Sequence, residues 1–124
     1  IPSKFRKELQ QGCVVAKGLD NCLQILTKKN WNQESEKMAS LPSTDKTSRQ
    51  LKRALFSGAV DSFLDSAGRI QIPENLRAYS AIKENDDVTV TGSGPVIEIW
   101  ATKTWKKIQS DSDNAFANIN EVKG

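Results

Sequence analysis

The chain repeats itself, and this repeat limits what it can fold into more than any other feature. The segment Ile1–Arg6 (IPSKFR) returns as Ile72–Arg77 (IPENLR), and the segment Val14–Trp31 returns as Val88–Trp105. A short repeated unit cannot bury its apolar face alone, so neighbouring copies must pack together. We therefore predict one body built from two pseudo-symmetric halves.

Each copy predicts the same order of elements. Proline suits the first turn of a helix, and alternating apolar residues on both sides of a glycine-containing turn are typical of a β-hairpin. Short helices are predicted over 2–9 and 73–80, and hairpins over 13–26 and 88–100. In the alignment of the hairpins Gly18 matches Gly92. The predicted class is α+β, mainly a β barrel with helices and a pseudo-two-fold axis.

Helices are expected after both hairpins and in the connection between the repeats. Thr27 can cap the first of these helices, which should run to about Ser40, whereas Ala101 has no side chain to cap the last. A further helix is predicted over 45–57 and an entering strand over 59–64. The expected parts are repeat 1 (1–30), a helical connector (31–58), repeat 2 (59–108) and a polar tail (109–124), which should be frayed from Ser110 on.

Histidine is absent from the sequence, which removes Ser-His-Asp and Cys-His catalysis and imidazole metal ligation. Cys13 and Cys22 are not spaced as zinc ligands, and Cys22 matches Val96, which favours a small buried side chain. We expect no cofactor, no metal and no enzymatic activity.

The charge is uneven along the chain. Residues 1–58 carry 11 basic and 5 acidic side chains, whereas residues 59–124 carry 7 and 10. A basic half is compatible with a polyanionic partner. No apolar run approaches the roughly 20 residues of a membrane helix. Nothing resembling a signal peptide precedes the repeat, so a soluble intracellular protein is expected.

The segment Asp65–Pro73 (DSAGRIQIP) is the most informative local pattern. Gly68 permits a positive φ and hence a tight turn, and Asp65 and Arg69 can pair across it. Ile70 and Ile72 should face the core. Arg77 should emerge near the same edge as Arg69. An ordinary turn with a stabilising ion pair is the alternative interpretation of the first five residues alone.

Taken together, these stretches resemble a known family. The second repeat is similar to AbrB-like swapped-hairpin DNA-binding domains, and the whole chain resembles the MraZ family of two-repeat bacterial regulators. The resemblance covers about residues 1–108, and it is carried by four stretches: IPSKFR from Ile1, RQLKRALFSGA from Arg49, Asp65–Arg77, and Glu98–Trp100.

The resemblance implies a sequence-specific, DNA-binding transcriptional regulator of a bacterial division and cell-wall gene cluster, with repression favoured. It implies a ring-shaped homo-oligomer facing repeated boxes in double-stranded DNA, and a cytoplasmic, nucleoid-associated location. The expected DNA contacts are Arg69, Arg77, Lys4, Arg6 and Lys7, with Asp65 and Gly68 shaping the turn. The family pattern also implies a first Asp-x-x-Gly-Arg turn before Ile1, so we expect this chain to be truncated at its N-terminus.

Two alternatives stay open for the function: an AbrB-type antitoxin, and a structural ring-forming module without DNA binding. Arg49, Lys52 and Arg53 are interpreted as a solvated face or intersubunit ion pairs, with phosphate contact as the alternative. Trp31 and Trp105 are expected to anchor helices.

Two further patterns are given their simpler interpretations. The run Gly92-Ser93-Gly94 is taken as a hairpin turn rather than a phosphate loop, because no Lys-Ser/Thr follows it. The acidic stretch around Asp86 and Asp87 is taken as a solvated loop, because its spacing fixes no coordination sphere.

Overall fold

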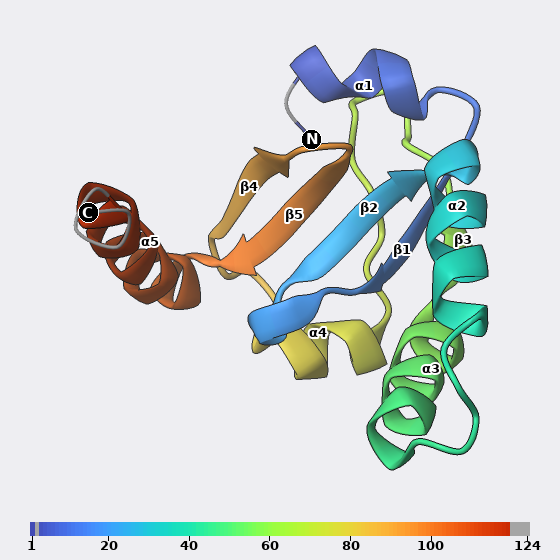
Figure 1. Cartoon of the computed structure of the whole chain (residues 1–124). Coiled ribbons are helices and arrows are strands. Elements are labelled where there is room, and N and C mark those ends of the chain that lie inside the picture. Colours follow the sequence, from blue (N-terminus) through green and yellow to red (C-terminus); the bar gives the residue numbers. More distant parts are fainter. Residues whose placement is uncertain (2, 120–124) are drawn as a thin grey trace.

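The computed structural model of the chain describes residues 1 and 3–119, without the side chains of Ser3 and Lys4. The helices are α1 (Ser3–Leu9), α2 (Lys28–Ala39), α3 (Lys46–Gly58), α4 (Glu74–Ser80) and α5 (Thr102–Ala117), with a short 3-10 turn, η1, at Leu19–Asn21. The strands are β1 (Cys13–Lys17), β2 (Leu23–Thr27), β3 (Val60–Ser62), β4 (Val88–Ser93) and β5 (Val96–Ala101). Figure 1 shows their arrangement.

The strands form one antiparallel sheet in the order β3-β1-β2-β5-β4. The two hairpins meet where β2 pairs with β5, and Gln24 lies opposite Glu98, its own counterpart in the other repeat. On either side Leu23 pairs with Ile99 and Ile25 with Ile97. This reciprocal register places a local two-fold axis at the Gln24–Glu98 pair. The prediction of two pseudo-symmetric halves in one α+β body is therefore confirmed.

The closed barrel is not formed by the described strands. They leave the sheet open, with β3 and β4 at its two edges. The ladder stops at β3, which has only three residues, and the chain then crosses the core face towards α4 without joining a strand. The predicted class is confirmed in the form of an open sheet with helices.

The predicted sequence alignment of the two hairpins is off by one residue in the first strand of each hairpin. Val15 pairs with Ile25, whereas Val90 pairs with Ile99, so Val15 corresponds to Val90 and the predicted match of Val14 with Val88 is wrong. The match of Gly18 with Gly92 is lost for the same reason. The cause is turn length, because five residues separate the paired Lys17 and Leu23, whereas four separate the equivalent pair Gly92 and Ile97.

The core lies on one face of the sheet, between the strands and the helices α1 and α4. It is built from residues that alternate along the strands, because successive side chains point to opposite faces of a sheet. These are Cys13, Val15, Leu23, Ile25, Ile97, Ile99 and Ala101, with Leu9 from α1 and Leu76 from α4. Ile70 and Ile72 pack against them while Gln71 is exposed, as predicted.

Helices α2 and α3 lie together at the β1 side of the molecule, and α5 leaves the other side (Figure 1). Thr27 caps α2, with its hydroxyl accepting a hydrogen bond from Asn30 N at 3.1 Å, as predicted. Helix α5 has no side-chain cap at Ala101, also as predicted. It nevertheless continues to Ala117, so the expectation of a chain frayed from Ser110 is wrong.

Candidate functional site

The Asp65–Arg69 turn is closed by four hydrogen bonds. Two are between backbone groups, from Asp65 N to Arg69 O (2.9 Å) and from Gly68 N to Asp65 O (3.0 Å). The other two are accepted by Asp65 Oδ1, from Ala67 N (2.9 Å) and Arg69 N (2.8 Å). Gly68 sits at φ +75°, a conformation that side chains other than glycine rarely adopt. The turn is therefore fixed by its own residues.

The predicted ion pair between the side chains of Asp65 and Arg69 is not formed. The Asp65 carboxylate binds backbone N–H groups instead, and within the described part of the chain the only side-chain ion pair joins Lys37 and Glu34. The hydrogen bond from Arg69 N lowers the pKa of the Asp65 carboxyl, with smaller contributions from Ala67 N and the charges of Arg69 and Arg6. Asp65 thus shapes the turn and leaves the Arg69 guanidinium without a carboxylate partner among those residues.

Arg6 of α1 holds the turn from outside. Its Nε donates to Ile1 O at 2.8 Å, and the nitrogen of Ile1 donates to Gly68 O at 2.8 Å. Its guanidinium also lies directly over Gly68, where a Cβ atom would overlap it. Ile1 and Arg6 of the first repeat therefore cover the turn of the second repeat. Their contacts explain why Gly68 is buried although the turn is at the surface.

The cations around this turn face solvent. Arg69, Arg6 and Lys7 are exposed, as are Ser66 and Ala67 at the tip. The side chain of Lys4, a predicted contact, lies outside the described residues. Lys28 approaches the same end of the molecule, with its Nζ 5.6 Å from the ring centre of Phe63, which is 65% exposed. The result is a basic surface around a rigid turn.

Arg77 does not join this surface. Figure 1 shows α4 at the opposite end of the sheet from α1, and Tyr79 Oη on α4 donates to Gly18 O at 2.6 Å in the turn between β1 and β2. The expectation that Arg77 and Arg69 emerge at one edge of the subunit is therefore wrong. Arg77 is half-buried, and its Nε has no hydrogen-bond acceptor among the described residues. A buried donor without a partner is costly, so this group is available to an acceptor.

The sequence did not indicate that Arg6 packs over the turn at Gly68. Its only signal was the match of Ile1–Arg6 with Ile72–Arg77, which makes Arg6 the counterpart of Arg77. Lys28 and Phe63 were also missed, because they lie far apart in the chain and meet only at the edge formed by β3.

The remaining candidate residues have structural roles. Trp105 packs on Trp100 of β5 with ring centres 5.6 Å apart, and Trp31 meets Phe56 of α3 edge-on at 6.0 Å. Gly94 and Pro95 make the hairpin turn that was predicted between β4 and β5.

The acidic loop before β4 is closed by its own side chains and backbone. Asp86 accepts the backbone N–H of Lys83 at 2.9 Å. No group of three or more potential metal ligands occurs among residues 1 and 3–119. No helix in that part of the chain is both long and apolar enough to cross a membrane.

Both cysteines are buried and unpaired. Burial, together with the nearby Glu98 and Asp20 carboxylates, raises the pKa of the Cys22 thiol to about 12. Burial likewise raises the pKa of the Cys13 thiol. The prediction of a small buried side chain at Cys22 is confirmed, although Cys22 lies just before β2 rather than in it.

Two joined hairpins, a reciprocal central register and a rigid turn that carries an arginine define a two-repeat α+β protein of the AbrB-like type. Comparison with protein families agrees with this class. The sequence model of the family described as "MraZ protein, putative antitoxin-like" matches residues 1–54 and again 55–123. The chain belongs to the MraZ family, which is a family of regulators.

Proposed function

We propose that this chain is a sequence-specific DNA-binding transcriptional regulator that acts as a homo-oligomer on repeated DNA boxes, with repression as its mode of action. The observation that carries the proposal is the Asp65–Arg69 turn. It is rigid, it projects an exposed arginine, and its acidic residue is occupied by backbone N–H groups. A preorganised guanidinium suits bidentate hydrogen bonding to a guanine or to a phosphate.

The surroundings of the turn support a polyanionic partner. Arg6 and Lys7 flank it from α1, and phosphate contacts from such cations would position the protein without reading sequence. A single turn makes few contacts, so linked copies on linked boxes would raise the affinity through effective concentration. An assembly of repeated subunits is therefore expected to bind a series of repeated DNA boxes.

An antitoxin role is the second candidate, because the matching family description carries the words "antitoxin-like". Such a protein would bind DNA and also cover a toxin. The exposed side chain of Phe116 on α5, with Ile119 just after the helix, is the apolar feature of this chain that a toxin would have to cover. Copurification of a stoichiometric partner protein with the intact chain would favour this role over that of a regulator alone.

Selection from a random DNA duplex library, followed by sequencing, tests the proposal. The expected result is enrichment of a short box, with multiple spaced copies enriched further and affinity falling steeply with salt. Salt-sensitive binding without an enriched box would contradict sequence-specific reading. Absence of salt-sensitive binding would leave the structural ring-forming module as the account of this protein.

A further inference from the structure

Phe63 is an exposed aromatic residue beside the Asp65–Arg69 turn. It is 65% exposed, although leaving an apolar ring in water is unfavourable. Leu64 and Ile70, one on each side of the turn, pack against the core. Neighbouring side chains of an extended chain point to opposite sides, and the exposed Phe63 and Arg69 lie on the other side from this core-facing pair. The turn and the ring therefore share one outward face.

The ring of Phe63 is held in place by a glycine and a lysine. Gly12 has φ +101°, and a Cβ atom added to it would lie 3.0 Å from Cε1 of Phe63 and 3.2 Å from Cε of Lys28. The Nζ of Lys28 lies over the ring, 5.6 Å from its centre. One part of the ring thus rests against the Gly12 backbone and the Lys28 side chain, while the rest faces solvent in a fixed position.

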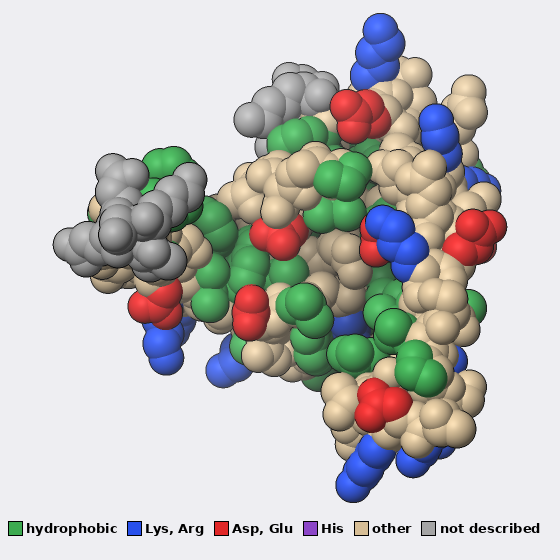
Figure 2. Space-filling model, in the orientation of Figure 1, with side chains coloured by type: hydrophobic (Ala, Val, Ile, Leu, Met, Phe, Trp, Pro, Cys, Tyr) green, Lys and Arg blue, Asp and Glu red, His purple; other side chains and the backbone are tan. Residues whose placement is uncertain are grey.

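Cations surround this ring and outnumber the free carboxylates. The exposed cations are Arg6, Lys7, Lys28 and Arg69, and no ion pair involves any of them in the part of the chain that the structure describes. The exposed carboxylates beside them, apart from that of Asp65 in the turn, are those of Glu8 and Asp61. In Figure 2 Lys and Arg side chains project at the end of the molecule where α1 lies. The ring is an apolar spot on a surface suited to a polyanion.

Duplex DNA offers such a ring one apolar group at the edge of its bases. The faces of the bases are stacked, whereas the C5-methyl group of thymine projects into the major groove and is contacted there by apolar side chains. Phe63 precedes Asp65 by two residues, which corresponds to about 7 Å of extended chain. This length equals about two base steps of a DNA strand. Asp65 is paired with Arg69 through a hydrogen bond of 2.9 Å, so ring and guanidinium are spaced to meet neighbouring bases.

We propose that Phe63 packs on the methyl group of a thymine that lies within about two base pairs of the base read by Arg69. Phe63 is then a second specificity-determining residue, and the box contains a thymine at a fixed distance from a guanine. This inference rests on the DNA binding of the proposed function and adds to it the residue that selects the neighbouring base.

Binding of the full chain to the selected box and to boxes with single thymines replaced by deoxyuridine tests the contact. Each replacement removes one methyl group and leaves the base pairing intact. For the parent chain, replacement at one position should weaken binding about fourfold, which corresponds to about 0.8 kcal/mol for one buried methyl-sized group. In Phe63→Ala the same replacement should have no effect, because the ring that contacts the methyl group is gone.

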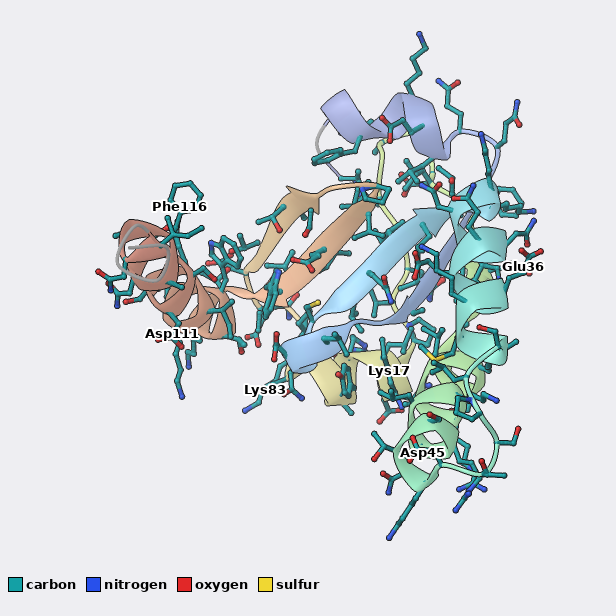
Figure 3. The ribbon with its side chains drawn as sticks, in the orientation of Figure 1. Lys17, Glu36, Asp45, Lys83, Asp111 and Phe116 are labelled. Carbon is teal, nitrogen blue, oxygen red and sulfur yellow. The ribbon has the colours of Figure 1, made fainter. Side chains whose placement is uncertain are left out.

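The comparison is made within each variant, so a change in the folded fraction of Phe63→Ala cancels from the ratio of its two affinities. Phe63→Leu keeps an apolar side chain and should retain part of the discrimination between thymine and deoxyuridine. Phe116→Ala is the matched control, since Phe116 is 78% exposed and stands on α5, away from the turn (Figure 3). It should bind both duplexes like the parent chain.

The outcomes separate this inference from the proposed function. A box without a thymine near the guanine, a parent chain indifferent to deoxyuridine, or full discrimination in Phe63→Ala would each overturn the Phe63 contact and leave DNA reading by Arg69 intact. Loss of discrimination in Phe116→Ala as well would also overturn it, because the effect would then not belong to the ring beside the turn. A selection that enriches no box would overturn both this contact and the proposed function.

Discussion

At the residue scale, the candidate site depends on Gly68 as much as on its arginines. The Gly68 backbone adopts a positive φ, and the absence of a Cβ atom leaves room for the Arg6 guanidinium. The sequence predicted the first requirement from the Asp-x-x-Gly-Arg pattern. It did not predict the second, because the contact joins residues 62 positions apart and depends on how the repeats dock.

Gly68→Ala should therefore lower the free energy of unfolding by about 1–3 kcal/mol from backbone strain, with a further loss from overlap with Arg6. In an Arg6→Ala background the same substitution should cost less, because only the strain is left. Chemical denaturation of the four chains gives the coupling between the two sites. If the losses of unfolding free energy from the two single substitutions simply add in the double variant, Arg6 does not contact Gly68 in solution.

The role assigned to Asp65 was partly predicted. The sequence placed it in the turn, but an ion pair with Arg69 was expected because charge and spacing allow one. The folded turn instead offers two backbone N–H groups to Oδ1, and these are fixed in place without ordering a long side chain. This local competition with the backbone is common for aspartate and is difficult to predict from spacing.

The lowered pKa of Asp65 predicts how the stability of the fold depends on pH. Its pKa is lower in the folded protein than the usual 3.8, so its ionised form stabilises the fold above that pH and the contribution is lost as the pH falls through the lower folded pKa. Asp65→Asn should flatten the decline of melting temperature below about pH 4, relative to Asp61→Asn, which changes an exposed carboxylate outside the turn. An unchanged acid decline in Asp65→Asn would contradict the assignment.

At the element scale, the sequence predicted the order of helices and hairpins, since proline positions, alternation and capping residues are local signals. It missed the one-residue shift between β1 and β4, because glycines in both turns suggested an alignment that the turn lengths do not allow. It also missed the length of α5. The polar residues after Gln109 suggest a frayed tail, whereas the helical spacing of Trp105, Ile108 and Phe116 continues through them.

The caps of the equivalent helices α2 and α5 differ, and this difference can be tested. Thr27→Ala removes the hydroxyl that accepts from Asn30 N and should lower the free energy of unfolding by about 0.5–2 kcal/mol. Thr44→Ala, at an exposed loop threonine before α3, should cost little. Equal effects of the two substitutions in urea denaturation would show that the Thr27 cap does not stabilise α2.

At the scale of the whole molecule, the repeats form one unit because β2 and β5 pair around the Gln24–Glu98 axis. This arrangement brings α1 of the first repeat onto the turn of the second and sends α4 to the far end. The sequence predicted the two-fold relation from the repeat itself. It could not show that Arg69 and Arg77 are separated, because that depends on which end of the sheet each helix covers.

The distance between Arg69 and Arg77 limits how one subunit can contact DNA. Within one subunit Arg69 lies at the α1 end and Arg77 at the α4 end, so the two arginines cannot approach the same base step together. Under the proposed function, DNA is read by Arg69 of the Asp65–Arg69 turn without Arg77 beside it, and the subunits repeat that turn around the assembly. The loss of Arg69 would then recur in every subunit that engages a box.

The most direct test is the affinity of Arg69→Ala for the selected box and for a scrambled duplex at matched salt, with Lys83→Ala as the control at an exposed lysine (Figure 3). If Arg69 reads a base, affinity for the box should fall by about 1–3 kcal/mol per contact, while the scrambled duplex is affected much less and the melting temperature is retained. Equal weakening on both duplexes, with the salt slope reduced by about one per contact, would show contact with phosphate alone. Unchanged affinity for the box would contradict the assignment of the Asp65–Arg69 turn to DNA recognition.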